Sequence, residues 1–182
     1  MHGLIFTSFR DFITVQYGPG IAKSILEGRP VHLLTEAYPD EDFLAVVGKA
    51  CEQTRVETDD LVREFGVFAG ETTFPHLYPA FYSVAGGARP FLLTVEALIH
   101  ELVRATIPNA TPPQLLVTPL DEDGVQIEYS SPRRLCILVR GLVEGTARHY
   151  GEKAAIDETA CMHRGDPACI FRISFSSPLR AA

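Results

Sequence analysis

One histidine of this sequence lies where a metal ligand could be presented. His100 falls within residues 91–107, whose apolar side chains recur at the spacing of an amphipathic helix. Glu96 lies one turn before it and Arg104 one turn after it, at the margin of the apolar stripe. A neutral imidazole facing an apolar groove suits the axial coordination of haem iron. The alternative is an ordinary structural histidine on the flank of a helix.

A second set of residues could bind carboxylates. Tyr129, Ser131 and Arg133 occupy alternate positions at the end of a predicted strand, so in extended backbone their side chains project from one face. Two hydroxyls and a guanidinium form a row of donors that suits one or two carboxylates, such as the two propionates of a porphyrin. The alternative is a solvated strand end, where Pro132 has ended the pairing.

Cysteines and a histidine near the C-terminus have the spacing of zinc ligands. Cys161, His163 and Cys169 lie within one short segment, and Cys136 precedes them by twenty-five residues. Reduced thiols supply the thiolates that zinc prefers, and a closed four-ligand site would be structural. The alternative is a set of ordinary thiols at helix and strand positions.

The periodicity of apolar residues, interrupted by glycine and proline, predicts the elements that position these side chains. Helices are predicted over 9–17, 20–27, 41–53, 61–68, 91–107 and 135–150. Strands are predicted at 115–117 and 125–129, as a hairpin, and near 153–158 and 169–175. We therefore expect an α+β fold in one domain, 1–182. Its helical N-terminal half, 1–70, packs on an α+β half, 71–182, of antiparallel strands plus helices.

Composition excludes several classes of function. The 182 residues are 46% apolar and carry 16 basic against 23 acidic side chains, a net charge of −7. This balance argues against partners that present phosphate backbones, so neither nucleic acid nor an anionic membrane is expected. The longest apolar stretch is interrupted by Glu96, His100 and Glu101, and no secretory signal is recognisable. We expect a cytoplasmic protein with reduced thiols.

Taken together, these motifs resemble one family, the haem nitric oxide/oxygen binding (H-NOX, HNOB) domains related to the haem domain of soluble guanylate cyclase. The resemblance covers nearly the whole chain. Its motifs are the helix with His100, Ala110-Thr111-Pro112-Pro113, Tyr129-x-Ser131-x-Arg133, the Met1-His2-Gly3-x-Ile5-Phe6 start, Tyr17-Gly18 and Gly141-Leu142-x-Glu144-Gly145. It implies a haem b held between the two halves.

The resemblance also implies a role for each matching residue. His100 becomes the only protein ligand to the iron, and Tyr129, Ser131 and Arg133 bind the propionates. Pro113 matches a proline that presses on the porphyrin, and Ile5 matches a residue at the haem edge.

The distal side of the haem is expected to select the gas. Bound dioxygen gains from a hydrogen-bond donor, whereas nitric oxide binds ferrous iron strongly without one. Oxygen-binding relatives carry a distal Tyr where this sequence has Leu138, and their supporting Trp and Asn correspond to Phe9 and Ala69. These apolar residues imply a sensor for nitric oxide, and more weakly carbon monoxide, that excludes oxygen.

Some members of the family carry cysteines matching Cys136, Cys161 and Cys169, which bind zinc or respond to thiol oxidation. Their fourth ligand is a His, and this sequence has Glu158 at that position. Either His163 substitutes for it, or Glu158 binds through oxygen.

We therefore expect a stand-alone, bacterial-type haem sensor and not an enzyme. Nitric oxide would rupture the bond between iron and His100, and one half would then rotate against the other. In the family, such modules signal to a partner such as a histidine kinase or a diguanylate cyclase. The alternative function is a haem-independent thiol/zinc redox sensor. A peroxidase-type enzyme would need a distal acid–base residue, and none aligns.

Overall fold

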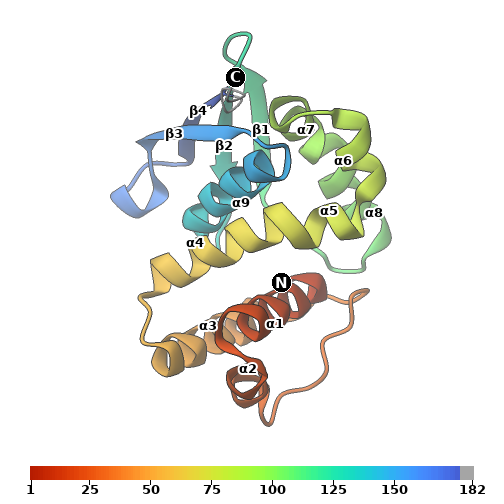
Figure 1. The fold of residues 1–182 in the computed structure, drawn as a ribbon, viewed down its shortest axis with the longest axis vertical. Coiled ribbons are helices and arrows are strands. Elements are labelled where there is room, and N and C mark those ends of the chain that lie inside the picture. The colour runs from red at the N-terminus through yellow and green to blue at the C-terminus, as the bar shows by residue number, and fades with distance from the viewer. Residues whose placement is uncertain (177–182) are drawn as a thin grey trace, which may run out of the picture.

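The structure, a computed structural model, describes residues 1–176; residues 177–182 of the predicted second half lie outside them. Three helices form one layer at the N-terminal end of the chain (Figure 1): α1 (Gly3–Tyr17), α2 (Pro19–Leu26) and α3 (Asp40–Thr54). The three helices predicted here are confirmed. The first begins earlier than predicted because the imidazole of His2 accepts a hydrogen bond from the Leu4 amide, at 3.0 Å, and caps it.

A long helical run follows across the middle of the molecule. It consists of α4 (Thr58–Phe68), a π-helical turn (Ala69–Thr73), α5 (Phe74–Leu77) and α6 (Pro79–Ala85). Pro75 and Pro79 each lie in the first turn of a short helix, where proline's missing N–H costs nothing. This run turns the chain from the helical layer toward the sheet (Figure 1).

The helix predicted over 91–107 is present but not uniform. Its parts are α7 (Ala88–Thr94), a π-helical turn (Val95–His100) and α8 (Glu101–Thr106). The π turn ends on His100, and single π turns inside helices are frequent at functional sites. No helix within residues 1–176 has the length and apolar character needed to cross a bilayer.

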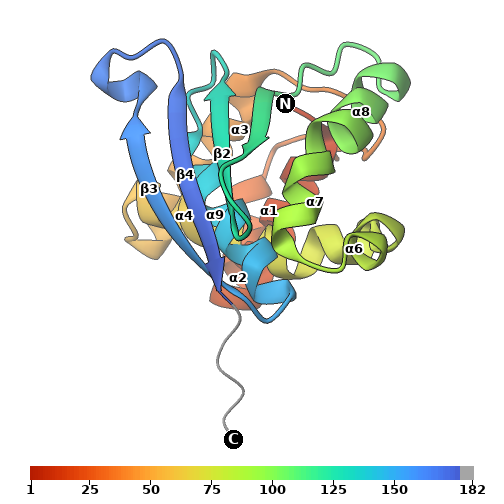
Figure 2. The same cartoon turned by 90° about the horizontal axis from the view of Figure 1, so that it is seen from above.

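The second half of the chain forms a four-stranded antiparallel sheet, in the order β1-β2-β4-β3. Its strands are β1 (Gln114–Pro119), β2 (Gly124–Ser130), β3 (Lys153–Ala160) and β4 (Cys169–Ser176). The predicted hairpin is β1–β2, with Leu115 opposite Tyr129. Helix α9 (Cys136–His149) follows β2 and lies between the sheet and α4 (Figures 1 and 2). The α+β fold is confirmed.

Helix α9 belongs to both hydrophobic cores. One core gathers the aromatic residues of α1, α3 and α4 and includes Leu138 of α9. The other lies under the sheet and includes Cys136 and Val143 of the same helix. Any movement of the helical layer relative to the sheet therefore has to involve the contacts of α9.

Candidate functional site

A cavity opens between α1, helices α5–α9 and strands β1 and β2. Its walls are mostly apolar, with Ile5 from α1, Val103 from α8, Ile127 from β2 and Leu142 from α9. A largely apolar cavity with a few convergent polar groups is the usual form of a cofactor site. The polar groups that line this cavity are therefore the candidates for function.

His100 lines the cavity from the end of the second π turn, with 16% of its side chain exposed. Its Nδ1 lies 2.7 Å from Oε2 of Glu96, whose other oxygen, Oε1, is bound by Arg104. Burial lowers the pKa of His100 in spite of the neighbouring carboxylate, so the imidazole is neutral. Burial acts to raise the pKa of Glu96, but its bonds to Arg104 and His100 lower it overall, so the carboxylate is ionised.

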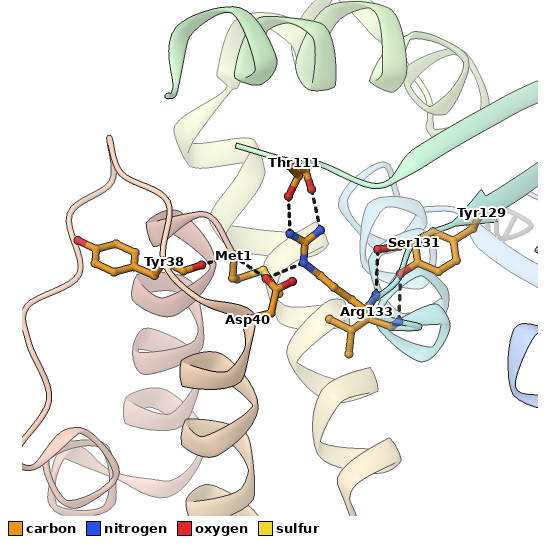
Figure 3. Close-up of polar contacts among 8 residues, drawn as sticks. Met1, Tyr38, Asp40, Thr111, Tyr129, Ser131 and Arg133 are labelled. Atoms are coloured by element: carbon orange, nitrogen blue, oxygen red, sulfur yellow. Dashed lines mark hydrogen bonds and ion pairs between the residues drawn. The ribbon is translucent and has the colours of Figure 1, made fainter. Parts of the chain in front are cut away.

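Arg133 reaches the cavity wall from the loop between β2 and α9 and donates to three oxygen atoms of two residues (Figure 3). Its Nε donates to Oδ1 of Asp40 at 2.8 Å. Its Nη1 and Nη2 donate to the carbonyl and hydroxyl oxygens of Thr111, at 2.6 and 2.7 Å. The amino group of Met1 also donates to Asp40, at 2.6 Å. Burial acts to raise the pKa of Asp40, but these two cationic partners lower it overall.

Tyr129 and Ser131 line the cavity beside Arg133 (Figure 3). The Tyr129 hydroxyl accepts a hydrogen bond from the Leu135 amide at 3.0 Å, and the Ser131 hydroxyl accepts one from the Arg133 amide at 3.3 Å. Burial raises the pKa of Tyr129, so its hydroxyl keeps its proton and remains a donor. The structure thus brings all three members of the motif together in the cavity lining (Figure 3).

The other sequence-predicted site residues divide into two groups. Pro113, Ile5 and Leu138 line the cavity. Phe9 and Ala69 are fully buried in the helical core and do not line it. Sequence reasoning did not single out Tyr78, Tyr82 and Thr146, three hydroxyl residues of the wall. The two tyrosines lie in the aromatic segment of α5–α6, which gave no signal beyond hydrophobicity.

A family model described as Haem-NO-binding (HNOB) matches residues 2–158 of this chain. The chain belongs to this family. HNOB domains are sensor domains that bind haem. A search of curated protein sequences finds no match.

Solved structures of H-NOX proteins share the fold. An H-NOX protein from S. oneidensis in the Fe(II)NO ligation state has a TM-score of 0.88 at 24% identity, covering 97% of this chain and 100% of that one. An unliganded Fe(II) H-NOX protein from K. algicida has 0.83 at 22%, with both chains fully covered. An oxygen-binding H-NOX domain has 0.86 at 24%, covering 100% and 98%. Because this shared fold includes both an NO complex and an oxygen complex, it does not by itself select the gas.

The cavity of this HNOB domain fits haem. Glu96 occupies Nδ1 of His100, which leaves Nε2 as the ring nitrogen available for iron. The apolar walls suit the porphyrin, and Tyr129, Ser131 and Arg133 offer donors for its carboxylates. When bound, haem would supply an iron atom that can bind a diatomic gas.

A second candidate site lies where the start of α9 meets the end of β3 and the start of β4. The ligand atoms of Cys136, Glu158, Cys161 and Cys169 all lie within 4.8 Å of one another. The Sγ of Cys161 is 3.9 Å from the Sγ atoms of Cys136 and Cys169. Tetrahedral zinc with Zn–S bonds of about 2.3 Å separates two sulfurs by about 3.8 Å. A disulfide would need about 2.05 Å.

The fourth position of this cluster is occupied by Glu158. Its Oε1 is buried and has no hydrogen-bond partner within residues 1–176, while its Oε2 lies 3.7 Å from Nη1 of Arg164. An unpartnered buried carboxylate oxygen is costly, and binding a cation would satisfy it. His163 is exposed, and its Nε2 donates to the carbonyl of Arg134 at 2.8 Å. The side chains present therefore fit zinc with three sulfurs and one carboxylate oxygen.

Proposed function

We propose that this HNOB domain senses nitric oxide at ferrous haem b. His100 would be the only protein ligand to the iron, and Tyr129, Ser131 and Arg133 would hold the propionates. The observation that carries the proposal is an imidazole with one free nitrogen in an apolar cavity whose lining also includes a guanidinium and two hydroxyls. Pro113 and Ile5, which also line the cavity, would contact the porphyrin.

The proposed preference for nitric oxide, with weaker binding of carbon monoxide and exclusion of oxygen, rests on Leu138. This apolar side chain lines the cavity at the position where oxygen-binding relatives are expected to carry a donor. Phe9 and Ala69 are buried in the core of the helical layer and do not line the cavity. They would contribute to the exclusion of oxygen by keeping this core free of polar groups. The other hydroxyl groups of the wall that could act as a hydrogen-bond donor to bound oxygen are those of Tyr78, Tyr82 and Thr146.

The signal would leave through the elements that meet at the cavity. Release of His100 by the iron would free α7–α8, and the helical half, 1–70, would rotate against the α+β half. The domain itself would be a cytoplasmic non-enzyme that controls a partner such as a histidine kinase or a diguanylate cyclase. Helix α9 supports this route because it packs in both cores.

Zinc would be held by Cys136, Cys161, Cys169 and Glu158. It would tie the start of α9 to β3 and β4, on the same half as the propionate donors. Oxidation of the thiols would release this tie and provide a second input. A redox sensor that works without haem is the less favoured alternative, because it leaves the cavity without a role.

Absorption spectra of the haem-loaded ferrous protein test the gas preference. We expect nitric oxide to change the spectrum and oxygen to form no stable complex. Leu138→Tyr, which supplies a distal donor, should raise oxygen affinity, whereas Leu142→Phe, another substitution on the same wall, should not. A stable oxygen complex in the unmodified protein that is lost in Tyr82→Phe would contradict the proposed selectivity and identify the donor.

A further inference from the structure

The contact between Glu96 and His100 has a specific geometry. Both residues lie in the π turn, four residues apart, and Oε2 of Glu96 is 2.7 Å from Nδ1 of His100. An ionised carboxylate can only accept hydrogen bonds, so the proton of the neutral imidazole must be on Nδ1. The Nε2 atom then carries the lone pair.

Arg104 fixes the orientation of the carboxylate. It binds Oε1 of Glu96 from two turns further along the helix and leaves Oε2 for His100. The side chains of Glu96 and His100 are 30% and 16% exposed, so water screens their contact less than it would at the surface. Hydrogen bonds with an ionised partner are roughly twice as strong as neutral ones.

We propose that Glu96 is a positioning residue for His100, one that holds Nε2 ready to bind iron and makes that nitrogen a stronger electron donor. The inference rests on the proposed role of His100 as the haem ligand. A carboxylate on the second ring nitrogen fixes the ring orientation and increases the basicity of the ligand. Electron donation of this kind favours ferric over ferrous iron and strengthens the bond between iron and histidine. Glu96 therefore sets how readily His100 is released.

The test compares Glu96→Gln with Glu101→Gln, which removes the same charge from the exposed neighbouring position of the same helix. In the haem-loaded protein, Glu96→Gln should shift the ferric–ferrous equilibrium about tenfold toward ferrous, since a charged hydrogen bond is replaced by a neutral one. Tenfold corresponds to a rise of about 59 mV in the one-electron midpoint potential. The iron–histidine stretching band in resonance Raman spectra should move to lower frequency. Equal potentials and equal bands in the two variants would overturn the inference.

A second measurement does not depend on haem. In the haem-free protein at pH 8, nitrogen NMR of the His100 ring should show the proton on Nδ1. Glu96→Ala should redistribute that proton between the two nitrogens, and Glu101→Ala should leave it in place. An unchanged tautomer in Glu96→Ala would overturn the inference. Failure of the proposed function can be told apart from failure of this inference. In that case the unmodified protein would bind no haem, but NMR of the haem-free protein would still show the His100 proton on Nδ1.

Discussion

At the scale of single residues, Arg133 shows what the sequence predicts and what it omits. Its place in a row with Tyr129 and Ser131 follows from the alternation of side chains along a strand. Its bonds to Thr111 and Asp40 join segments that are 22 and 93 residues away, and no local pattern encodes such pairings. The donors of the site were therefore predictable, and the groups that orient them were not.

Arg133→Ala should accelerate haem loss more than Ser131→Ala. It removes a cationic partner of the carboxylate whose contact is worth about 1.5–3 kcal/mol, whereas the serine contributes one hydrogen bond from an uncharged hydroxyl, worth about 1 kcal/mol. We expect the haem off-rate to rise by roughly 10- to 100-fold in the first variant and by less than about tenfold in the second. Arg134→Ala, which removes the same charge from an exposed neighbour, is the matched control. Equal off-rates in all three variants would rule out a propionate role.

The Asp40 contact predicts a dependence of stability on pH. Its pKa is lowered from the ordinary 3.8 because the folded state binds the ionised form more strongly. The stabilisation is present above pH 3.8 and is lost as the pH falls through the lower folded-state pKa. Asp40→Asn should therefore lower the Tm at pH 7, and the two Tm values should converge at acid pH. A constant difference between pH 7 and pH 3 would show that the carboxylate charge is unimportant.

At the scale of elements, periodicity predicted most helices and the hairpin but missed both π turns. A π turn adds one residue to a helical turn and leaves the apolar pattern on either side intact, so a period of 3.6 residues passes over it. The helix with His100 was accordingly predicted as uniform, and its start at Ala88 was placed too late. The crossing of α4 and α9 was not predicted either, although glycines of α9 lie at this crossing.

Gly141 allows α9 to approach α4 closely. A Cβ at this position would lie 2.2 Å from the carbonyl oxygen of Arg63, which is backbone and cannot move independently. Gly141→Ala should lower the free energy of unfolding by roughly 1–3 kcal/mol, as overpacking does. Gly48→Ala in α3, where a Cβ meets nothing within 4 Å, should instead stabilise by up to about 1 kcal/mol. Chemical denaturation of both variants checks this, and a stabilised Gly141→Ala would show that the crossing is loose.

At the scale of the whole molecule, composition and element order predicted the α+β class, and the HNOB family match accords with it. The contact of α9 with β3 and β4 was harder to predict from the sequence. Three cysteines were predicted to gather, but the choice between His163 and Glu158 depended on how the β3–β4 connection turns. The structure brings Glu158 to the thiols and turns His163 toward Arg134.

The cluster predicts one zinc ion per chain. Elemental analysis should find it in the purified protein, and Cys161→Ser should abolish it because Cys161 is adjacent to both other thiols. Glu158→Ala should weaken zinc binding, whereas His163→Ala should retain the metal.

Oxidation of the thiols gives a second test. Because the zinc ion would join α9 to the sheet, oxidant should also alter partner activity in a haem-free His100 variant. Absence of zinc, with no effect of oxidant, would leave the cysteines as structural residues.

The central claim is that His100 is the haem ligand. The most direct measurement is the absorption spectrum of His100→Gly purified with and without imidazole, beside His76→Gly as an exposed histidine outside the cavity. The account predicts that His100→Gly loses haem, that free imidazole restores the spectrum, and that His76→Gly behaves as the unmodified protein. Full haem retention with an unchanged spectrum in His100→Gly without imidazole would contradict it.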